Sequence, residues 1–513
     1  MHQLKHIVLL LFLIGFAMSC AADIARPPPN IVYILADDLG YAELGSYGQE
    51  KIKTPNIDQL ALEGMRFTQH YSGNTVCAPS RAVLMTGKHP GHAHIRNNGK
   101  GVLSTELKQR YRMDFRGQKA IPDAEVTIAE LLQGQGYATA AIGKWGLGHF
   151  GTPGDPNLQG FDLFFGYNDQ AHAHSFYPEY LWRNGVKVPL GNNPPVPGHA
   201  DFPKGADPDD PASYASFKGS DYSADHMIEE ALGFIRENRD GPFFLYFPST
   251  IPHLALHIPD EELEPYLGKW EETPYLRDTE KGYTPHQTPR AAYAAMISRL
   301  DRDVGRIMQE LKSLGLDENT LVMFSSDNGT TFLKQEVDYE FFESVGPLRG
   351  FKSSLYEGGI RVPMIARWPG KIEASTTSEH LSAFWDVMPT MAEVAGVKPP
   401  QETDGISFLA TLLGKPGTQQ KHDFLYWEFA GHGGLQAVRM GDWKAVRQDL
   451  LNEDSSQPLK TELYNLSSDI GETTDVASQY PGVVRQMEAI MESEHTPSEL
   501  FPMPALDSPS ELN

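Results

Sequence analysis

The chain has 513 residues, of which 40% are hydrophobic, so it has enough apolar material for a large core and is too long for one simple domain. Lys and Arg total 43 while Asp and Glu total 67, which gives a formal charge of -24 at pH 7. This acidic balance argues against a nucleic acid as a partner.

Residues 1–22 are predicted to be an export signal. A polar start with one lysine precedes the apolar run 7–18, which is too short for a comfortable membrane span, and small residues follow. Cleavage near Ala21 or Ala22 would give a soluble periplasmic or secreted protein. Cleavage before Cys20 would instead leave that cysteine for lipid attachment, giving an outer-membrane lipoprotein held at a membrane. The residues before Cys20 lack the leucine usual in such a signal, which favours soluble export.

Beyond a proline-rich linker at 23–29, strand-like and helix-like segments alternate. Short apolar runs predict buried strands, and longer runs with apolar residues three and four positions apart predict helices. Strands are expected at 31–36, 137–142, 243–247 and 320–325, and helices at 54–64 with cap and stop included, 127–132, 223–238 and 291–314. This alternation predicts an α/β fold with a large mixed, mostly parallel sheet sandwiched by helices.

The alternation lapses from about residue 421. Shorter strand-like pieces at 424–429 and 443–447 are followed by a helix-like stretch at 483–492. We therefore expect a main domain at 30–420 and a smaller C-terminal α+β domain at 421–513.

Pairs of oxygen-bearing side chains end two of the predicted strands. Asp37-Asp38 follows the first strand, and Asp327-Asn328 follows the strand at 320–325. Ligands bind at the carboxyl ends of strands in open α/β sheets. Hard divalent cations take carboxylate and amide oxygens, so the four residues together predict a calcium site, with magnesium disfavoured by its stricter geometry. Each pair taken alone is more typical of a turn.

Cys77 is the only cysteine left once Cys20 is assigned to the leader. An exported chain normally pairs its cysteines, so a lone thiol indicates an intermolecular bond or chemistry of its own. The alternative is a free cysteine that packs as a small core residue. Cys77 begins the segment Cys-Ala-Pro-Ser-Arg, and a Cys-x-Pro-Ser-Arg has a chance occurrence of about 1 in 1,000 in a chain this long. The segment therefore favours chemistry.

The segment 77–81, continued by Leu84-Met85-Thr86-Gly87, resembles the signature of formylglycine-dependent sulfatases in the alkaline phosphatase superfamily. The resemblance implies that a formylglycine-generating or anaerobic sulfatase-maturating enzyme oxidises Cys77 to the aldehyde-bearing residue 3-oxoalanine. The hydrated aldehyde then attacks sulfur through one hydroxyl and releases sulfate through the other. The resemblance also assigns one Ca²⁺ ion to five ligands, Asp37, Asp38, Cys77, Asp327 and Asn328.

Further motifs extend this resemblance over most of the chain and make 30–420 the catalytic domain. The segment 143–148, Gly-Lys-Trp-Gly-Leu-Gly, and the segment 350–363 are each similar to a sulfatase segment whose lysine contacts the sulfate. Pro252-His253 is similar to a segment whose histidine protonates the leaving-group oxygen, a role that suits a side chain titrating near neutrality. With an arginine one helical turn beyond the nucleophile, the implied catalytic set is Cys77, Arg81, Lys144, His253 and Lys352.

One residue departs from the sulfatase pattern. Gly146 stands where sulfatases usually have the histidine that supports the formylglycine, a variant shared by some sulfatases of polysaccharides. We hypothesise that His149, His172 or His174 supplies the missing imidazole, although a solvent-exposed histidine is the commoner outcome for each. The residues predicted to contact substrate are His172, His174 and His257.

The resemblance implies a sulfatase that hydrolyses sulfate esters of a carbohydrate, such as a galactan or glycosaminoglycan fragment. The polar and aromatic stretch at 160–182, which includes Gln170, suits stacking on sugar rings and hydrogen-bonding to them, although its aromatic residues could equally be buried in a core. Because the net charge repels an anionic substrate, we expect a site that is locally positive. Two alternatives stay open: a phosphonate or phosphate ester hydrolase of the same superfamily, and a carbohydrate-binding relative weakened by Gly146.

Overall fold

The structure is a computed structural model that describes residues 28–112, 118–277, 280, 282–452 and 458–507. The predicted leader with Cys20 lies outside the described residues, and so do the expectations on export and lipid attachment that depend on it. Among the described helices, none is both long and apolar enough to cross a membrane.

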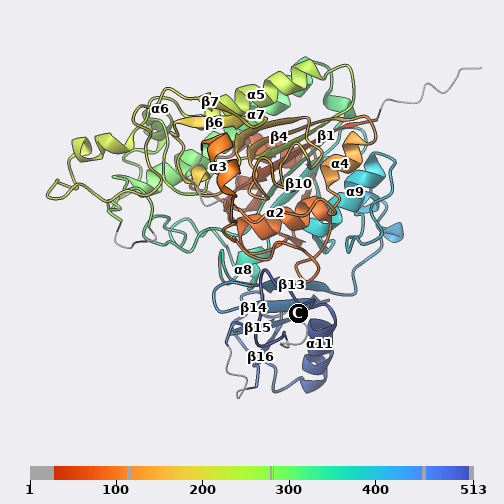
Figure 1. Ribbon diagram of the computed structural model, residues 1–513. Coiled ribbons are helices and arrows are strands. Elements are labelled where there is room, and N and C mark those ends of the chain that lie inside the picture. Colours follow the sequence, from red (N-terminus) through yellow and green to blue (C-terminus); the bar gives the residue numbers. More distant parts are fainter. Residues whose placement is uncertain (1–27, 113–117, 278–279, 281, 453–457, 508–513) are drawn as a thin grey trace, which may run out of the picture.

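A ten-stranded mixed sheet runs through the larger lobe of the described chain (Figure 1). Its central strands β9, β1, β8, β4 and β5 pair in parallel, and antiparallel pairs flank them on both sides. From edge to edge the strands are β11 (Thr376–Ser378), β2 (Met65–Phe67), β10 (Met364–Arg367), β9 (Thr320–Ser326), β1 (Asn30–Ala36), β8 (Phe243–Pro248), β4 (Ala138–Lys144), β5 (Leu163–Tyr167), β6 (Tyr180–Arg183) and β7 (Val186–Pro189). The predicted fold class is confirmed.

Alternate residues of β1 divide the core between the two faces of this sheet. Val32 and Ile34 pack on one face, whereas Tyr33 and Leu35 pack on the other. The first face is covered by α1 (Pro55–Leu62), α5 (Ser223–Glu237) and α7 (Pro289–Ser313), and the second by α2 (Cys77–Thr86), α4 (Ile128–Gln133) and α9 (Val387–Val394). Every residue of β1 is buried, as expected for a strand covered on both sides.

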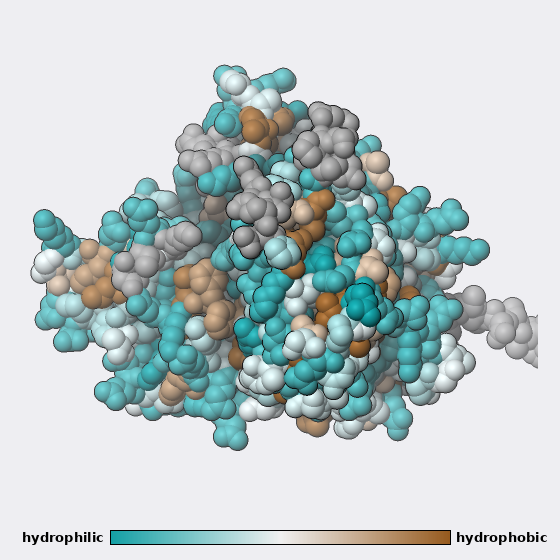
Figure 2. All heavy atoms as spheres, turned by 90° about the horizontal axis from the view of Figure 1, so that it is seen from below, coloured by the Kyte–Doolittle hydropathy of each residue, from teal (hydrophilic) through white to brown (hydrophobic). Residues whose placement is uncertain are grey.

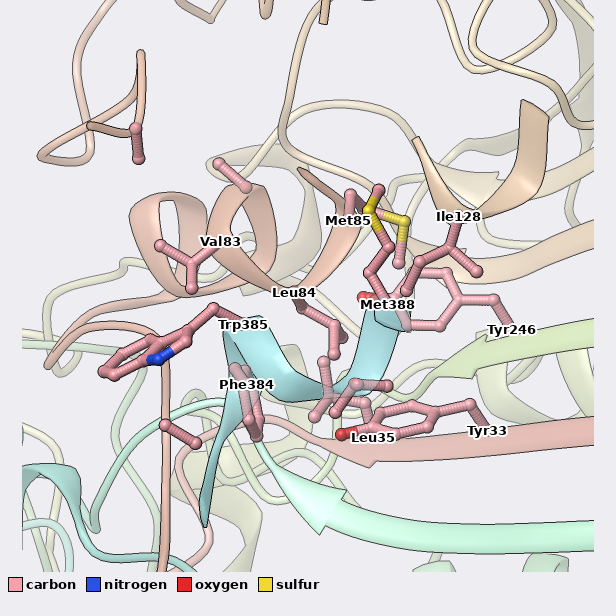
Figure 3. Packing of buried hydrophobic residues seen from close by; sticks show 14 of the residues in the cluster. Tyr33, Leu35, Val83, Leu84, Met85, Ile128, Tyr246, Phe384, Trp385 and Met388 are labelled. Carbon is pink, nitrogen blue, oxygen red and sulfur yellow. The ribbon is translucent and has the colours of Figure 1, made fainter. Parts of the chain in front are cut away.

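Helix α2 is fixed against the sheet along its whole length. All ten of its residues are buried, and Leu84 and Met85 share one apolar cluster with Met388 of α9 and with Tyr33 of β1 (Figure 3). The helix begins at Cys77 itself, two residues before Pro79. Proline is tolerated there because the first turn of a helix does not use its N–H groups. The first residue of α2 therefore has a rigid position.

The C-terminal lobe is a separate antiparallel sheet with one long helix. Its strands, in order, are β13 (Leu425–Phe429), β14 (Leu435–Met440), β15 (Trp443–Arg447) and β16 (Thr461–Asn465), and the helix is α11 (Pro481–Ser493). Met487 and Met491 of α11 cover one face of the sheet, while Trp427 on the other face joins the core of the larger lobe. Seen from the end that carries this lobe, the surface is mainly hydrophilic with scattered apolar patches (Figure 2). The smaller α+β domain is confirmed, and its boundary at residue 421 stays a prediction.

A buried group of charges, here called the interlobe cluster, joins the two lobes: Glu357, Arg361, Arg439, Lys444 and Glu472. Lys444 Nζ lies 2.8 Å from Glu357 Oε1 and 3.1 Å from Glu472 Oε1. Arg361 lies 3.3 Å from the other carboxylate oxygen of Glu357, which also accepts the hydroxyl of Tyr71 at 2.6 Å. Glu357 begins the short helix α8 (Glu357–Ile360), so this cluster ties a loop of the larger lobe to β15.

The predicted strands and helices of the larger lobe are all present, with ends that differ by up to two residues. Strands β5, β6 and β7 were not predicted. Their residues lie in the stretch 160–182 and just beyond it, and Phe161, Tyr177 and Trp182 in that stretch are buried. These aromatic rings belong to the core, so the sugar-stacking interpretation of this stretch is wrong. The remaining short strands and α-helices are β3 (His70–Tyr71), α3 (Thr105–Tyr111), α6 (Asp260–Leu263), β12 (Ser382–Ala383) and α10 (Leu409–Leu412).

Candidate active site

The structure brings the predicted metal-binding and catalytic residues together at one edge of the sheet. Asp37-Asp38 directly follows β1, Asp327-Asn328 directly follows β9, and Lys144 is the last residue of β4. Parallel neighbours end at the same edge, so these side chains converge. Three more sources complete the group, which is here called the active-site cluster: Cys77 and Arg81 on α2, His253 after β8, and Lys352 on the loop before α8.

Asp37 lies at the centre of the basic side chains. Lys144 Nζ donates to its Oδ2 at 2.6 Å, and a guanidinium nitrogen of Arg81 lies 3.2 Å from the same oxygen. Cys77 Sγ lies 3.4 Å from Oδ1. Burial alone would raise the pKa of Asp37, but Lys144, His253 and Arg81 together hold this pKa below its ordinary value. Asp37 is therefore a carboxylate even though it is fully buried.

Asp38 contacts a different set of side chains in the same cluster. Lys352 Nζ donates to both of its carboxylate oxygens at 2.7 Å, and the side-chain amide of Asn328 donates to Oδ1 at 2.7 Å. His253 Nε2 lies 3.6 Å from Oδ2. Burial raises the pKa of Asp38 and Asp37 adds to the rise, against the opposing charge of Lys352.

Arg81 joins the two strand ends. Its guanidinium donates to Asp327 Oδ2 at 3.0 and 2.9 Å and also to the backbone carbonyl of Lys144. Burial and the nearby Asp37 raise the pKa of Asp327 to about 7, despite Arg81. Asp327 Oδ1 accepts the backbone N–H of Asp38 at 3.1 Å, which fixes the spacing between the two strand ends.

Cys77 has a thiol that keeps its proton. It is 1% exposed, and burial together with Asp37 raises the pKa of its thiol to about 12. The thiolate is the nucleophilic form of cysteine. An unmodified Cys77 would therefore be a poor nucleophile at neutral pH.

The cluster fits a divalent cation. The ligand atoms of Asp37, Asp38, Cys77 and His253 all lie within 4.8 Å of one another. Asn328 Oδ1 borders this group and is buried without a hydrogen-bond partner among the described residues. Carboxylate and amide oxygens are the donors that calcium prefers, and an unmatched buried oxygen carries a desolvation cost that a cation would remove.

A second group of possible metal ligands, His89, His92 and Glu494, lies elsewhere in the described chain. His89 Nδ1 accepts the N–H of Gly91 at 3.1 Å, so the proton of a neutral ring sits on Nε2, which lies 3.1 Å from a Glu494 oxygen. His92 Nδ1 lies 3.0 Å from both oxygens of Asp404. These side chains already satisfy one another as hydrogen-bonded pairs.

A pocket of about 630 Å³ opens above Cys77. His174 lines it, and its ring stacks on that of His253 with centroids 5.2 Å apart. Burial and His253 lower the pKa of His174 well below its ordinary value, so His174 is neutral. The lining residues are Val76, Cys77, Asn97, Asn98, Gly99, Lys100, Gln118, Asp169, Gln170, Ala171, His174, His253, Tyr283, Lys352, Ser353, Phe429 and His432.

The other predicted histidines do not line this pocket. His172 packs between Tyr167 and Tyr180, and His257 Nδ1 accepts the backbone N–H of Phe176 at 3.4 Å. His149 packs on aromatic rings at centroid distances of 5.4 to 5.9 Å. All three rings are buried in the core of the fold. Their positions give no support to a contact of His172 or His257 with substrate, nor to replacement of the missing imidazole by His149 or His172.

Several pocket residues were not found from the sequence: Gln118, Asp169, Tyr283 and Phe429. They come from segments without a recognisable motif, and Phe429 comes from the C-terminal lobe. The signal available for Asp169 was its place just beyond the end of β5, and Gln170, in the stretch expected to hydrogen-bond sugar, lines the pocket beside it.

Comparisons with known proteins agree with this geometry. Residues 29–397 match the sulfatase family model, and residues 350–496 match that of the C-terminal region of N-sulphoglucosamine sulphohydrolase. The chain is 34% identical over 441 residues to N-acetylgalactosamine-6-sulfatase of Rattus norvegicus, covering 84% of this chain and 73% of that protein. It is also 34% identical over 444 residues to arylsulfatase A of Homo sapiens, covering 84% and 76%.

Solved structures give the same picture. The crystal structure of Ps i-CgsB superimposes with a TM-score of 0.71 at 28% identity, covering 93% of this chain and 94% of that one, and a related structure holds k-i-k-neocarrahexaose. The phosphonate monoester hydrolase of Agrobacterium radiobacter, at 20% identity and a TM-score of 0.61, shows likeness of fold alone. With the family match over most of the chain, the convergence of the sulfatase motifs at one sheet edge leads to the conclusion that this protein belongs to the sulfatase family and is a sulfuric ester hydrolase.

Proposed function

We propose that this sulfatase hydrolyses a sulfate ester of a carbohydrate, using 3-oxoalanine made from Cys77 and one Ca²⁺ ion. The observation that carries the proposal is the buried Cys77, which keeps its thiol proton at neutral pH. It lies among carboxylates that could hold a cation and basic side chains that could hold a sulfate. Oxidation supplies what the thiol lacks, because the hydrated aldehyde offers one hydroxyl for attack on sulfur and a second for release of sulfate.

The ion would be held by the oxygens of Asp37, Asp38, Asp327 and Asn328, with the residue made from Cys77 as the fifth ligand. When bound, Ca²⁺ would add positive charge to a cluster whose three aspartates and three basic side chains otherwise balance, and would neutralise sulfate oxygens. A locally positive site on an acidic protein follows from this arrangement.

The basic side chains of the cluster orient the sulfate. Lys144 contacts Asp37 and Lys352 contacts Asp38, so a sulfate bound beside the two aspartates would be within reach of two ammonium groups. Arg81 is held by Asp327 and keeps a permanent charge beside Cys77.

His253 is proposed to protonate the leaving-group oxygen. Its Nδ1 donates to the carbonyl of Leu254 at 2.6 Å, so the neutral ring carries its proton on Nδ1. A second proton, when the ring takes one up, would therefore bind at Nε2, which faces the cluster. Burial, Lys352 and Lys144 lower the pKa of His253 well below its ordinary value. An incoming sulfate offsets the charge of both lysines and so favours the protonated ring that general acid catalysis needs.

The carbohydrate assignment draws on the relatives and on the pocket. One relative is named an N-acetylgalactosamine-6-sulfatase, and a structural neighbour was solved with a carrageenan oligosaccharide. The pocket beside Cys77 combines neutral polar side chains with the rings of Tyr283 and Phe429, which suits a sugar. His174, on the pocket wall, is proposed to contact this sugar. Maturation of Cys77 by a partner enzyme and export of the chain are parts of the same proposal.

The test is sulfate release by protein produced together with a formylglycine-generating enzyme and assayed with Ca²⁺. We expect hydrolysis of at least one substrate in a panel of sulfated mono- and disaccharides, and none by the Cys77→Ala variant. Turnover of 4-nitrophenyl sulfate and of bis(4-nitrophenyl) phosphate on the same preparation compares the sulfatase with the phosphate ester alternative. Faster hydrolysis of the phosphodiester, or hydrolysis by Cys77→Ala, would contradict the proposal.

A further inference from the structure

Because Gly146 has no side chain, the side chain of Gln170 occupies the space next to it, beside the active-site cluster. The loops after the parallel strands β4 and β5 run together, with the N–H of Trp145 donating to Tyr167 O at 2.9 Å and the N–H of Gly146 donating to Asn168 O at 3.3 Å. Gly146 has a φ of +81°, and a Cβ there would lie 2.3 Å from Nε2 of Gln170. Any side chain at position 146 would therefore displace the amide of Gln170.

A second glutamine meets the same place from another segment. Oε1 of Gln118 would lie 3.2 Å from that Cβ. The backbone of Gln118 bridges to Lys100, and the N–H of Ile121 donates to Leu147 O at 2.9 Å, which holds this segment beside the loop of Gly146. The space left by the glycine is thus bordered by two side-chain amides from different parts of the chain.

Both amides are buried and unsatisfied. Gln118 and Gln170 are each 8% exposed, and both line the pocket that contains Cys77. Gln170 Nε2 and Gln118 Oε1 have no hydrogen-bond partner among the described residues. A buried donor or acceptor without a partner costs about 1–3 kcal/mol, so such pairs mark places where a ligand group completes the network.

The chemistry of this pair selects a neutral hydroxyl. An alcohol group accepts one hydrogen bond and donates another, which matches one amide N–H and one amide oxygen close together. A second sulfate fits poorly, because Gln118 Oε1 would repel it and the carboxylate of Asp169 lines the same pocket. The rings of Phe429 and His432, 6.1 Å apart, add apolar surface to the pocket that suits the body of a sugar.

We infer that Gln118 and Gln170 form a subsite that binds a free hydroxyl of the sulfated sugar next to the ester being cleaved, and that Gly146 is required to seat Gln170. This inference rests on the proposed function and adds the part of the substrate that the pocket recognises: an unmodified hydroxyl beside the sulfate. It also gives the glycine variant a positive role in substrate recognition.

The test compares two substrates in each variant. One is whichever of galactose 6-sulfate, N-acetylgalactosamine 6-sulfate and N-acetylglucosamine 6-sulfate the wild type hydrolyses best, and the other is 4-nitrophenyl sulfate, which has no hydroxyl. In Gln170→Ala and in Gln118→Ala we expect the ratio of kcat/KM for the sugar to that for the aryl sulfate to fall about 10-fold or more. Gly146→Ala is expected to lower the same ratio, because its Cβ would displace the amide of Gln170.

The matched control is Gln159→Ala. Gln159 is fully buried, its amide nitrogen donates to Pro153 O at 2.8 Å, its Oε1 has no hydrogen-bond partner among the described residues, and it does not line the pocket. This variant should lose stability while keeping the wild-type ratio.

Two failures are distinguishable. A wild type that hydrolyses a sugar sulfate, with kcat/KM unchanged on both substrates in Gln170→Ala, would overturn the hydroxyl subsite alone. Equal loss on both substrates also leaves the ratio unchanged and would overturn the subsite as well, because the amide would then act on the reaction centre. A wild type that hydrolyses 4-nitrophenyl sulfate but none of the sugars would overturn the carbohydrate assignment, and the subsite with it.

Discussion

Two of the buried groups of charges in the described part of the chain differ in how completely their members are paired. In the interlobe cluster both oxygens of Glu357 are matched, one by Lys444 and the other by Tyr71 and Arg361, and no part of the Lys444 side chain is exposed. In the active-site cluster Asn328 Oδ1 has no hydrogen-bond or ion-pair partner among the described residues, and Lys352 lines a pocket. A cluster whose charges are paired with one another joins the two lobes, whereas one that leaves an oxygen unpaired beside a pocket can take a ligand.

The largest expected effect separates proton transfer from binding within the active-site cluster. His253→Gln should lower kcat for a sugar sulfate by about 10²–10⁴-fold, the usual contribution of general acid catalysis. The same variant should lose much less with 4-nitrophenyl sulfate, whose leaving group needs no proton. Steady-state kinetics on both substrates measure this difference, and equal losses would show that His253 is not the acid.

Breaking the interlobe cluster should affect stability most. Lys444→Met leaves Glu357 and Glu472 buried without their shared cation and should lower the free energy of unfolding by about 3–5 kcal/mol. The control is Lys460→Met, because the Lys460 side chain is 73% exposed and its ion pairs should contribute less than about 1 kcal/mol. Denaturant unfolding of both variants checks this, and similar losses in the two would contradict the role given to the buried cluster.

Calcium should distinguish the two clusters directly. At a Ca²⁺ concentration about 100 times its dissociation constant, binding to the folded state adds about 2.7 kcal/mol to its stability. We expect thermal unfolding of the wild type and of Lys444→Met to shift upward with Ca²⁺ relative to EGTA. Asp327→Asn and Asn328→Ala should lose most of this shift. A full shift in both ligand variants would place the ion elsewhere.

The smallest effect is a pH dependence that belongs to the interlobe cluster. Burial raises the pKa of Glu472 to about 7, with help from Glu357 and against Lys444. Because this pKa lies above that of the unfolded chain, about 4.5, the contribution of Glu472 is fully present below pH 4.5 and is lost as pH rises toward 7. The advantage of the wild type over Glu472→Gln in unfolding free energy should therefore shrink between pH 5 and 8. An advantage that grows over this range would reverse the assigned shift.

How much of the site the sequence reveals depends on how each residue is placed. Asp37 and Asp327 were predictable because each directly follows an apolar strand, and parallel strands end together. Cys77, Lys144 and Lys352 stand inside recognisable motifs. The pairing of Gln118 with Gln170 in the pocket wall was not predictable, because the two side chains meet only through the packing of separate loops.

The side-chain directions of neighbouring histidines were not predictable from the sequence either. His172 and His174 lie in one 3-10 turn, yet His172 turns into the core while His174 lines the pocket. Side chains two positions apart in an irregular segment diverge in a direction that only the fold determines. The large sheet was predictable because its strands and helices repeat a simple pattern, whereas the aromatic strands β5 and β6, which lie between β4 and the edge strand β7, carry no such alternation.

The most direct test of the central claim is the mass of the peptide containing Cys77, taken from a preparation that hydrolyses a sulfate ester. The account predicts a lighter peptide in which oxygen has replaced the sulfur of Cys77 and two hydrogens are lost, as conversion to 3-oxoalanine requires. It also predicts that activity rises in proportion to the converted fraction. Full activity in protein whose Cys77 is wholly unmodified would contradict it.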